Sequence, residues 1–576
     1  MAVHAQLDSL GRPANWALIL LSIFLLSGHA LSQAGVSTAK RVQQVKRLYD
    51  GSRWDEVVRM VPESSTESSE LELYRGLALA HLGRYPEADR AFQAGHKGHP
   101  RDARFLTEMA GVAYIEKRFS TAKIDLRRAL GLDPRDAYSN NFLASIYYLE
   151  GNLDAALKYW NRVGKPKLVD LIYDPIPKLD PLILDRAFRF SPGSIWTRNR
   201  FLTTRAEIQS LDLFPHAFYE LQARPDGSFK LVWHDSERNR WNKMDLASIA
   251  STLRGLPYQT VYPEFYNLNG SGLNWRSLVR WDDEKRWFSG EIAEPIAQNP
   301  SQRFRLYFQD RNENWNVTGR LLPYLSSLSY FNLRRIAIGA GVQSIPNWRW
   351  QWNIDTEYSW RNFRTLTGIP QQAMPFFTNS SGLALRSTIQ RSLIQFPERR
   401  FSLDADITGE AGKFFTSPLG KYRRLEGSVN ADWLPQARGE DYETKTRLRA
   451  GGTFGQVPLD DLYMLGFDRD NDLWMRGHND LRNGQKGNSP LGRDFILSNS
   501  DFGKVVFHDG LFLVKAGPFL DTGDIYDPSQ FFGSPKWLTD TGLQVTVKVL
   551  GNFEFVLGYG KDLRSGNNTF YSTVSQ

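Results

Sequence analysis

Residues 347–359 read N-W-R-W-Q-W-N-I-D-T-E-Y-S, and their side chains alternate between two kinds without a break. The odd-numbered positions are polar or charged, whereas the even-numbered positions are mostly aromatic or apolar: Trp348, Trp350, Trp352, Ile354, Thr356 and Tyr358. A period of two predicts a β-strand whose two faces meet different surroundings. Three tryptophans on one face are unusual for a sheet in water, but they are typical of the wall of a membrane barrel with an aqueous interior.

The same alternation recurs throughout the C-terminal part of the chain. One face is apolar and the other polar in four further segments, at 303–309, 401–408, 425–433 and 543–549. At roughly 20–22 residues for each strand with its turn, residues 239–576 are predicted to form a transmembrane antiparallel β-barrel of about 16 strands. A soluble β-sandwich with its polar faces in outside water is the alternative.

Near the N-terminus lies an apolar run, Trp16–Leu26, which is too short to span a bilayer as a helix. Ala30-Leu31-Ser32 follows as a small-x-small cleavage pattern. Residues 1–32 are therefore predicted to be a secretory signal peptide, with an uncleaved anchor as the alternative. The chain contains no cysteine, which excludes disulfides and zinc–thiolate sites.

The composition of the chain limits which kinds of partner it is expected to bind. The 576 residues carry a formal net charge of +8, and the basic residues are scattered rather than clustered. Nucleic acid is therefore not expected as a partner, whereas contact with anionic outer-membrane lipid explains the positive charge. Phe, Trp and Tyr make up 13% of the chain, which suits the aromatic girdles at the edges of a membrane barrel.

A repeat of 34 residues occupies the region from 40 to 166. Small residues recur where two helices would cross, and larger apolar residues recur where they would pack. The four series are Gly76, Ala110 and Ala144; Tyr85, Phe119 and Leu153; Ala88, Ala122 and Ala156; and Phe92, Leu126 and Trp160. This pattern resembles the tetratricopeptide repeat. It predicts an α-helical solenoid whose concave face binds peptides or partner proteins.

The helical period stops in the region from 167 to 238. A predicted helix ends near Leu211, and the turn Pro225-Asp226-Gly227 separates two strand-like runs, at 218–221 and 229–233. A strand, helices and a closing hairpin predict a small α+β domain. The order of these elements and the Glu-Arg-Asn end at 237–239 resemble a polypeptide-transport-associated (POTRA) domain.

Two short motifs lie near the C-terminus. Met475-Arg476-Gly477-His478 has the form of an Arg-Gly loop tip, and Phe519-Leu520-Asp521-Thr522-Gly523 follows as Phe-x-Asp-x-Gly. In this order and spacing they resemble the signature of the bacterial surface antigen superfamily. That superfamily comprises the outer-membrane insertases and the two-partner-secretion translocators, whose barrels are preceded by POTRA domains. His478 departs from the pattern, because Phe or Tyr is frequent at that position.

The resemblance implies that Arg476 at the tip of an inward-folded loop contacts Asp521 of the barrel wall. Such a pair would hold the loop, from about 465 to 490, by charge-assisted hydrogen bonds. Gly477 would allow a tight tip, and Gly523 would allow a close backbone approach next to Phe519. We therefore expect Arg476 and Asp521 to be the loop-pinning pair, with Gly477, His478, Phe519 and Gly523 as the remaining motif residues.

A hydrolytic function is the competing interpretation of the same region. Asp521-Thr522-Gly523 and Asp540-Thr541-Gly542 both match the catalytic triplet of aspartic proteases. The nineteen residues between the two aspartates cannot build the separate lobe that each would need. Metal-binding, nucleophile-elbow and phosphate-loop motifs are absent from the sequence. We therefore expect no enzymatic activity, no metal and no cofactor.

These features together predict a protein of the bacterial outer membrane with its N-terminal domains in the periplasm. By the resemblance, it would insert or translocate polypeptides, and its repeats would recruit a periplasmic substrate or partner protein. A polysaccharide-export channel is the main alternative, since such exporters also join tetratricopeptide repeats to a barrel. A passive porin is a third possibility, but it leaves the repeats unexplained.

Overall fold

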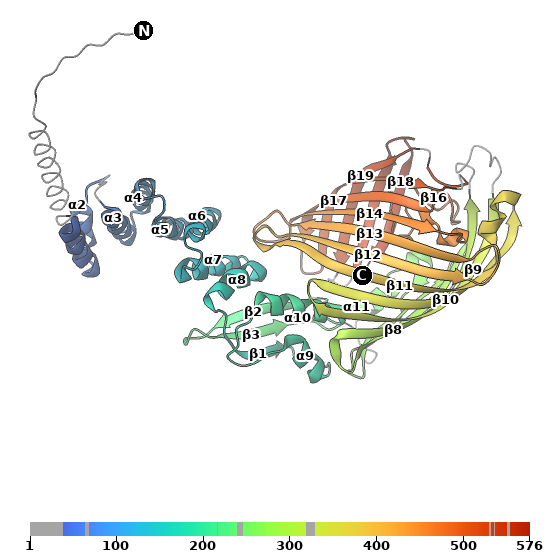
Figure 1. The fold of residues 1–576 in the computed structure, drawn as a ribbon, viewed down its shortest axis with the longest axis horizontal. Helices are drawn as coiled ribbons and strands as arrows, with labels where there is room; N and C mark the ends of the chain where they lie inside the picture. The colour runs from blue at the N-terminus through green and yellow to red at the C-terminus, as the bar shows by residue number, and fades with distance from the viewer. Residues whose placement is uncertain are drawn as a thin grey trace, which may run out of the picture. The chain divides into compact units, whose positions relative to one another are not determined.

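The computed structural model describes residues 38–63, 68–215, 217–238, 246–317, 329–528, 531–534, 536–549 and 553–575. The proposed signal peptide lies outside these residues. The chain divides into two compact units, Met1–Leu149 and Glu150–Gln576, and each is described by itself. Figure 1 shows helices in the first unit and strands in most of the second.

The first unit is helical. After a helix at 38–50 come α2 (Trp54–Met60), α3 (Ser69–His81), α4 (Tyr85–Gly98), α5 (Ala103–Ile115), α6 (Phe119–Leu132) and α7 (Ala137–Leu149). The starts of α3, α5 and α7 are 34 residues apart, so each sequence repeat begins a new helix pair. None of the described helices is long and apolar enough to cross a membrane.

Small residues let these helices approach one another. A Cβ atom at Gly76 would lie 2.3 Å from the ring of Phe92, so α3 and α4 meet at a point that admits only glycine. The alanines of the repeat series are buried, as are Phe92 and Leu126. Phe119 differs from the expected packing role, because its side chain is 40% exposed. It begins α6 and lies edge-on to Tyr114 rather than in the core.

The second unit starts with α8 (Leu153–Trp160), followed by an α+β module. The module contains β1 (Leu168–Asp174), α9 (Pro181–Phe188), α10 (Arg198–Ser210), β2 (Phe218–Ala223) and β3 (Phe229–His234). Its sheet has the order β1-β3-β2, with β1 parallel and β2 antiparallel to β3. The fully buried Trp233 forms the core, with Phe188 and Phe214 packed against it.

Local capping explains where the module's helices begin. The side chain of Asp180 accepts a hydrogen bond from the backbone N–H of Leu182, and Pro181 occupies the first turn of α9. Thr197 accepts a hydrogen bond from the backbone N–H of Arg200 at the start of α10. Such caps satisfy amide groups that the helix itself leaves without partners.

The rest of the second unit is one large antiparallel sheet of 16 strands, preceded by α11 (Leu246–Leu253). Its first part comprises β4 (Thr260–Val261), β5 (Glu264–Leu268), β6 (Leu273–Trp281), β7 (Lys285–Ile296), β8 (Asn299–Val317), β9 (Ser329–Asn347), β10 (Trp350–Thr367), β11 (Ser380–Phe396), β12 (Phe401–Phe414), β13 (Lys421–Trp433) and β14 (Tyr442–Phe454). The second part comprises β17 (Asp494–His508), β18 (Phe512–Tyr526), β19 (Leu538–Val549), β20 (Phe553–Asp562) and β21 (Asn568–Ser575).

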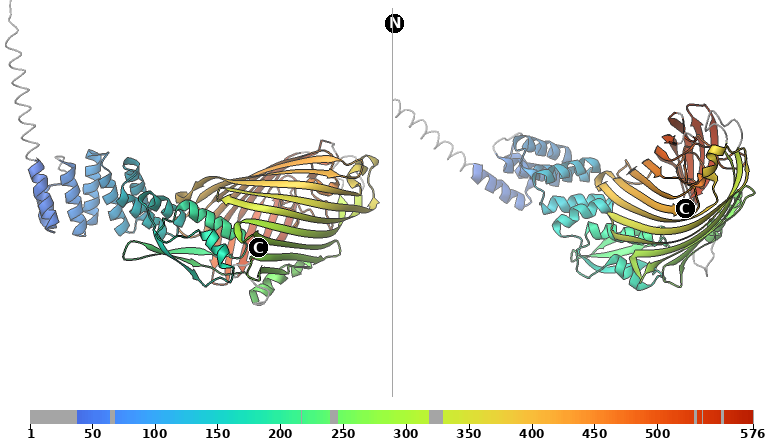
Figure 2. Two further views of the ribbon diagram at one scale, coloured as in Figure 1. Left: turned by 60° about the horizontal axis from the view of Figure 1, so that its bottom comes forward. Right: turned by 45° about the vertical axis from the view of Figure 1, so that its right-hand side comes forward.

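Neighbours in this sheet are nearly all consecutive in the sequence, as expected for an up-and-down barrel. Both β4 and β5 pair with β6 at one edge, and β21 forms the other edge. Figure 2 shows the sheet curving round on itself. Among the described residues no strand pairing joins the two edges, so the expected closed barrel is seen as a strongly curved sheet.

The stretch 347–359 is not one strand, which corrects the expectation drawn from its alternation. β9 ends at Asn347, Trp348 and Arg349 form the turn, and β10 begins at Trp350. The ring nitrogen of Trp348 donates to Asn199 Oδ1 of α10 at 2.6 Å. Trp348 therefore serves the contact with the α+β module, because the chain reverses direction before this residue can join the wall.

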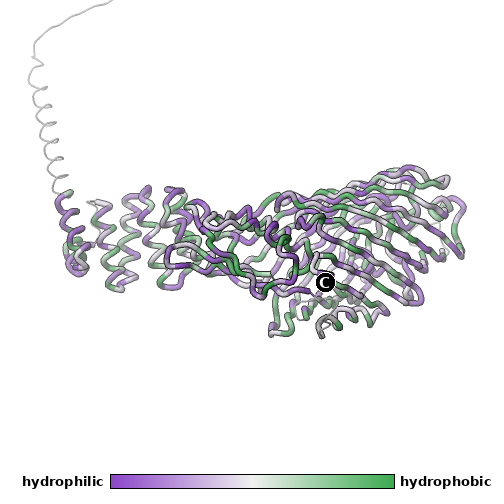
Figure 3. The backbone as a smooth tube through the Cα atoms, turned by 90° about the horizontal axis from the view of Figure 1, so that it is seen from below, coloured by the Kyte–Doolittle hydropathy of each residue, from purple (hydrophilic) through white to green (hydrophobic). Residues whose placement is uncertain are grey.

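From Trp350 onward the alternation holds. Asp355, Ser359 and Arg361 are buried on one face, whereas Ile354 and Trp360 on the other face are 44% and 45% exposed. We call the face that contacts residues 455–493 the inner face and the opposite one the outer face. Figure 3 shows hydrophilic and hydrophobic residues alternating along the strands.

The two ends of the sheet differ. At one end, which we call the module end, the turn carbonyl of Ala297 accepts a hydrogen bond from Arg186 of α9. At the same end, Asn152 at the start of α8 donates to the carbonyl of Pro397 at 2.7 Å. At the far end lie the short hairpin 415–420 and the long connection 455–493.

Candidate functional site

The connection between β14 and β17, residues 455–493, folds back along the inner face of the sheet. We call it the inner segment. It contains a short helical turn, Leu459–Asp461, and an antiparallel pair of two-residue strands, β15 (Tyr463–Met464) and β16 (Leu491–Gly492). Part of it is held by apolar packing, since Leu465, Leu473 and Met475 lie in one buried cluster with side chains of β17, β18 and β19.

The structure brings the sequence-predicted pair Arg476 and Asp521 together. The guanidinium of Arg476 donates from Nε to Asp521 Oδ2 at 2.9 Å and from Nη2 to Oδ1 at 2.6 Å. The backbone N–H of Arg476 also donates to Oδ2 at 3.0 Å. The guanidinium lies over the ring of Phe519, at 3.9 Å from its centroid, and also bonds Asp501 and Gln544. This is a bidentate, charge-assisted contact between buried groups.

Asp521 belongs to a row of three carboxylates on neighbouring strands. Asp540 is its direct partner across β18 and β19, and Asp562 is the partner of Asp540 across β19 and β20. Like charges directly opposite one another destabilise a sheet. The inner segment offsets the repulsion: Gly477 N–H donates to Asp540 Oδ2 at 2.6 Å, and the His478 ring lies between Asp540 and Asp562, at 3.0 and 3.4 Å.

Two glycines allow this close approach. A Cβ at Gly477 would lie 2.6 Å from the backbone nitrogen of Asp562 and 2.7 Å from the carboxyl carbon of Asp540. A Cβ at Gly560 of β20 would lie 2.1 Å from the carbonyl oxygen of Arg476. Gly523 is also confined, because its Cβ would lie 2.9 Å from the carbonyl oxygen of Ile496. The tip of the inner segment therefore lies directly on the wall.

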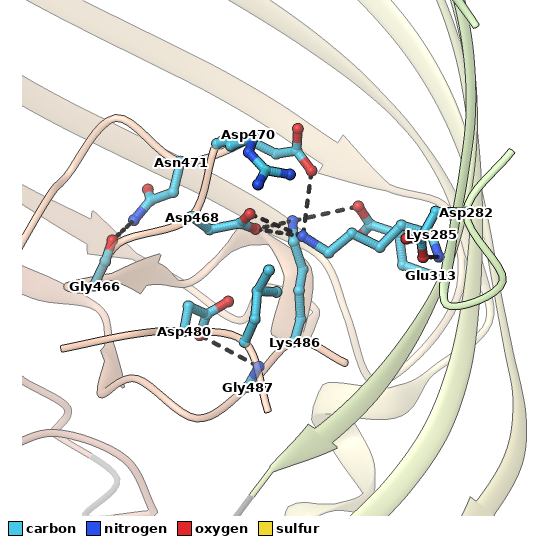
Figure 4. A network of polar contacts seen from close by, with 12 residues as sticks. Asp282, Lys285, Glu313, Gly466, Asp468, Asp470, Asn471, Asp480, Lys486 and Gly487 are labelled. Carbon is cyan, nitrogen blue, oxygen red and sulfur yellow. Dashed lines mark hydrogen bonds and ion pairs between the residues drawn. The ribbon is translucent and has the colours of Figure 1, made fainter. Parts of the chain in front are cut away.

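A second cluster, which the sequence reasoning missed, holds the inner segment to the inner face of strands near the other edge of the sheet (Figure 4). Lys285 of β7 donates to both carboxylate oxygens of Asp468, at 2.9 and 2.7 Å, and Arg280 of β6 contacts Asp470 at 2.6 Å. Lys486 lies 3.4 Å from Asp468 and 3.3 Å from Glu313 of β8. Two cations of the wall thus meet two anions of the segment.

Two further wall arginines contact the same segment. Arg361 of β10 binds Asp460 at 2.9 Å and Asp461 at 2.7 Å. Arg449 of β14 lies 3.2 Å from the carboxylate of Asp472. The sequence carried a usable signal for these contacts: acidic pairs in a turn-rich segment, and lone cations at the inward positions of alternating strands.

The tip has the composition of a metal site. His478, Asp540 and Asp562 place ligand atoms within 4.8 Å of one another, and such a set could hold a divalent ion. In the structure the imidazole lies between the two carboxylates, and Asp540 Oδ1 is buried without a hydrogen-bond partner among the described residues.

The geometry also bears on the protease interpretation. Asp521 and Asp540 are direct cross-strand partners, closer than the sequence argument allowed. Each carboxylate is nevertheless engaged separately, the first by Arg476 and Asn499 and the second by Gly477 and His478. A pair that shares one proton to activate water needs both carboxylates free to face the same site.

No protein-family profile and no curated protein matches this sequence. Among solved structures, it is similar to BamA from Haemophilus ducreyi lacking POTRA domains 1–3, with a TM-score of 0.41 and 10% identity over 71% of this chain and 84% of that one. CdiB from Escherichia coli matches with a TM-score of 0.47 and 12% identity over 72% and 77% of the two chains. CdiB from Acinetobacter baumannii gives 0.43 and 11% over 71% and 73%.

Proposed function

We propose that this chain is an outer-membrane β-barrel protein that inserts or translocates polypeptides, with the inner segment as a displaceable plug. The outer face of the sheet supports the membrane placement. Its middle exposes aliphatic side chains, namely Ile338, Ile354, Leu385, Ile389, Ile407, Leu425 and Leu448. Exposed aromatic residues flank this band at the module end (Trp350, Phe396, Trp433 and Tyr442) and at the far end (Trp281, Trp360, Phe415 and Phe454).

The height of this band fits a bilayer. Trp350 and Trp360 lie ten residues apart on β10, which is about 33 Å along a strand. A tilt of about 40° reduces this to about 25 Å across the membrane, the height of the apolar band of outer-membrane barrels. With the α+β module in the periplasm, the far end of the sheet faces the outside.

The observation that carries the transport function is the inner segment. It is fastened to strands across the sheet, from β6 to β20, largely through ion pairs and hydrogen bonds. Replacing one buried ion pair by another, or by water, costs little compared with leaving one partner alone. A polypeptide rich in polar groups can therefore take over these contacts as the segment withdraws.

The α+β module would present substrate to this path. Its strand β2 lies at an edge of the three-stranded sheet, in the order β1-β3-β2, which is the position at which a substrate strand would be added. The exposed ring of Phe218 begins this strand. The helical repeats would recruit the substrate or a partner protein before this step. No cofactor is needed for such a pathway.

The first test locks the inner segment. A Cβ built at Gly484 lies 3.4 Å from the Cβ of Glu284 at the far end, close to the separation that a disulfide requires. Since the chain has no cysteine of its own, Glu284→Cys with Gly484→Cys gives a single defined crosslink. The oxidised pair should stop export or insertion of polypeptides, and reduction should restore it. The single variants give the baseline activity, because Gly484 has a φ of +83° and Glu284 accepts a hydrogen bond from Gln485 of the inner segment.

Full activity of the oxidised pair would show that the segment need not move. The second test identifies the cargo with a photocrosslinker at Phe218 of β2, and at Asp226 in the exposed turn as the control. Capture of protease-sensitive material at Phe218 alone supports a polypeptide. Capture of a protease-resistant glycan would instead support the polysaccharide-export alternative.

A further inference from the structure

Three cations lie together on the outer face at the far end of the sheet. Lys413 is the penultimate residue of β12, Lys421 begins β13, and Arg423 follows two residues later on the same face. All three side chains are exposed. Among the described residues none of them makes an ion pair. We call this group the rim cluster.

The sequence places these charges where they repel one another. Lys413 and Lys421 are direct partners across β12 and β13, and Arg423 is the partner of Ala411. Like charges directly opposite each other destabilise an isolated antiparallel pair. An anion shared by the three side chains would turn this repulsion into attraction.

The surroundings place the cluster at the edge of the apolar band. Toward the middle of the sheet, the next large apolar side chains exposed on these two strands are Ile407 and Leu425. Beside the cluster lie two exposed rings: Phe415, whose centroid is 5.8 Å from Lys413 Nζ, and Phe454, the cross-strand partner of Arg423. Cations with long stems next to aromatic rings are typical of the level of lipid head groups.

We propose that Lys413, Lys421 and Arg423 bind the phosphate groups of a phosphorylated glycolipid in the outer leaflet. This inference rests on the proposed membrane placement. Arginine offers a planar fork to phosphate oxygens, and the two lysines supply compact charges at its side. The acyl chains of the same lipid would cover the apolar band below. The rim cluster and the apolar band next to it therefore match the polar and the apolar part of one ligand.

The test uses the full chain purified in detergent and bisphosphorylated lipid A as the probe, with binding followed by native mass spectrometry. The triple variant Lys413→Gln, Lys421→Gln, Arg423→Gln should bind it about 100-fold more weakly, at roughly tenfold or less for each charge. Arg391→Gln with Lys504→Gln is the matched control, because it removes exposed cations near the module end of the same sheet. This control should bind as wild type.

Further binding measurements show whether the cluster recognises a lipid phosphate or free phosphate. Dephosphorylated lipid should bind wild type and triple variant equally, and inorganic phosphate should compete only weakly. Equal binding of the probe by the triple variant, an equal loss in the control, or full competition by inorganic phosphate would each overturn the proposal. Polypeptide export by the triple variant separates the two proposals, because export can persist when lipid binding is lost. Absence of the wild-type protein from the outer membrane would refute the proposed membrane placement.

Discussion

The tip of the inner segment and the rest of the segment are fastened to the wall with opposite polarity. At the tip, the segment supplies cationic or donor groups, Arg476 and His478, to carboxylates of the wall. Away from the tip, the segment supplies Asp460, Asp461, Asp468, Asp470 and Asp472 to cations of the wall, with Lys486 beside Glu313 as the exception. A segment placed the other way round would bring like charges together. The charge pattern therefore specifies one docked position, which apolar contacts alone do not.

The largest effect is expected at the tip. Asp521→Ala leaves the buried guanidinium of Arg476 without its bidentate partner and should cost about 3–5 kcal/mol of unfolding free energy. Urea unfolding in detergent, followed by tryptophan fluorescence, measures this. In the double variant with Arg476→Ala, the cost should be less than the sum of the two single costs. Additive costs would show that the pair does not act as a unit.

The cluster around Lys285 should tolerate the loss of a carboxylate better than the tip does. Asp468→Asn removes one carboxylate, but Asp470 and Glu313 still face Lys285 and Lys486. We expect a loss of about 1–3 kcal/mol, smaller than that of Asp521→Ala. The same unfolding experiment compares the two. A larger loss for Asp468→Asn would place the main attachment of the segment here rather than at the tip.

The close approach of the tip can be broken without touching a charge. Gly477→Ala puts a methyl group against Asp540 and the backbone of Asp562, and should cost about 1–3 kcal/mol. Gly427→Ala is the matched control, because its Cβ would meet nothing nearer than 3.8 Å. Faster proteolysis of the inner segment in the first variant only is the expected result. Equal resistance of both variants to proteolysis would mean that the tip shifts to make room for the methyl group.

The α+β module contains a buried carboxylate whose one ion-pair partner is exposed, in contrast to Asp521 of the tip, whose partner Arg476 is buried. In the α+β module, Glu207 of α10 is fully buried, and its ion-pair partner Arg189 is largely exposed. Burial raises the pKa of Glu207 to about 7, although Arg189 opposes the shift. The folded module therefore holds a proton that the unfolded chain releases near its ordinary pKa of 4.5.

A raised carboxyl pKa makes stability fall as the pH rises. The contribution of Glu207 is complete below about pH 4.5 and is lost progressively up to about pH 7, by roughly 3 kcal/mol. Hydrogen exchange of the module's amides in the full chain measures this loss. Glu207→Gln should flatten the pH dependence between these values. An unchanged slope in that variant would assign the dependence to another group.

Much of the architecture could be predicted from local patterns. The period of 34 anticipated the starts of α3, α5 and α7, and the period of two anticipated a large antiparallel sheet of about sixteen strands. The hairpin at Trp348 was misjudged, because a turn of two residues preserves the alternation of the side chains on either side of it. The contact of Trp348 with Asn199 of α10 gives this residue another role.

The sequence by itself determined which face of each strand is polar and where helices replace strands, since these properties depend on neighbours a few residues apart. Only the tertiary structure decided which charges meet. Lys285 and Asp468 are separated by 183 residues, and Asp521, Asp540 and Asp562 become neighbours through strand register alone. Register depends on turns and packing over the whole sheet, so no short motif encodes the aspartate row that the inner segment covers.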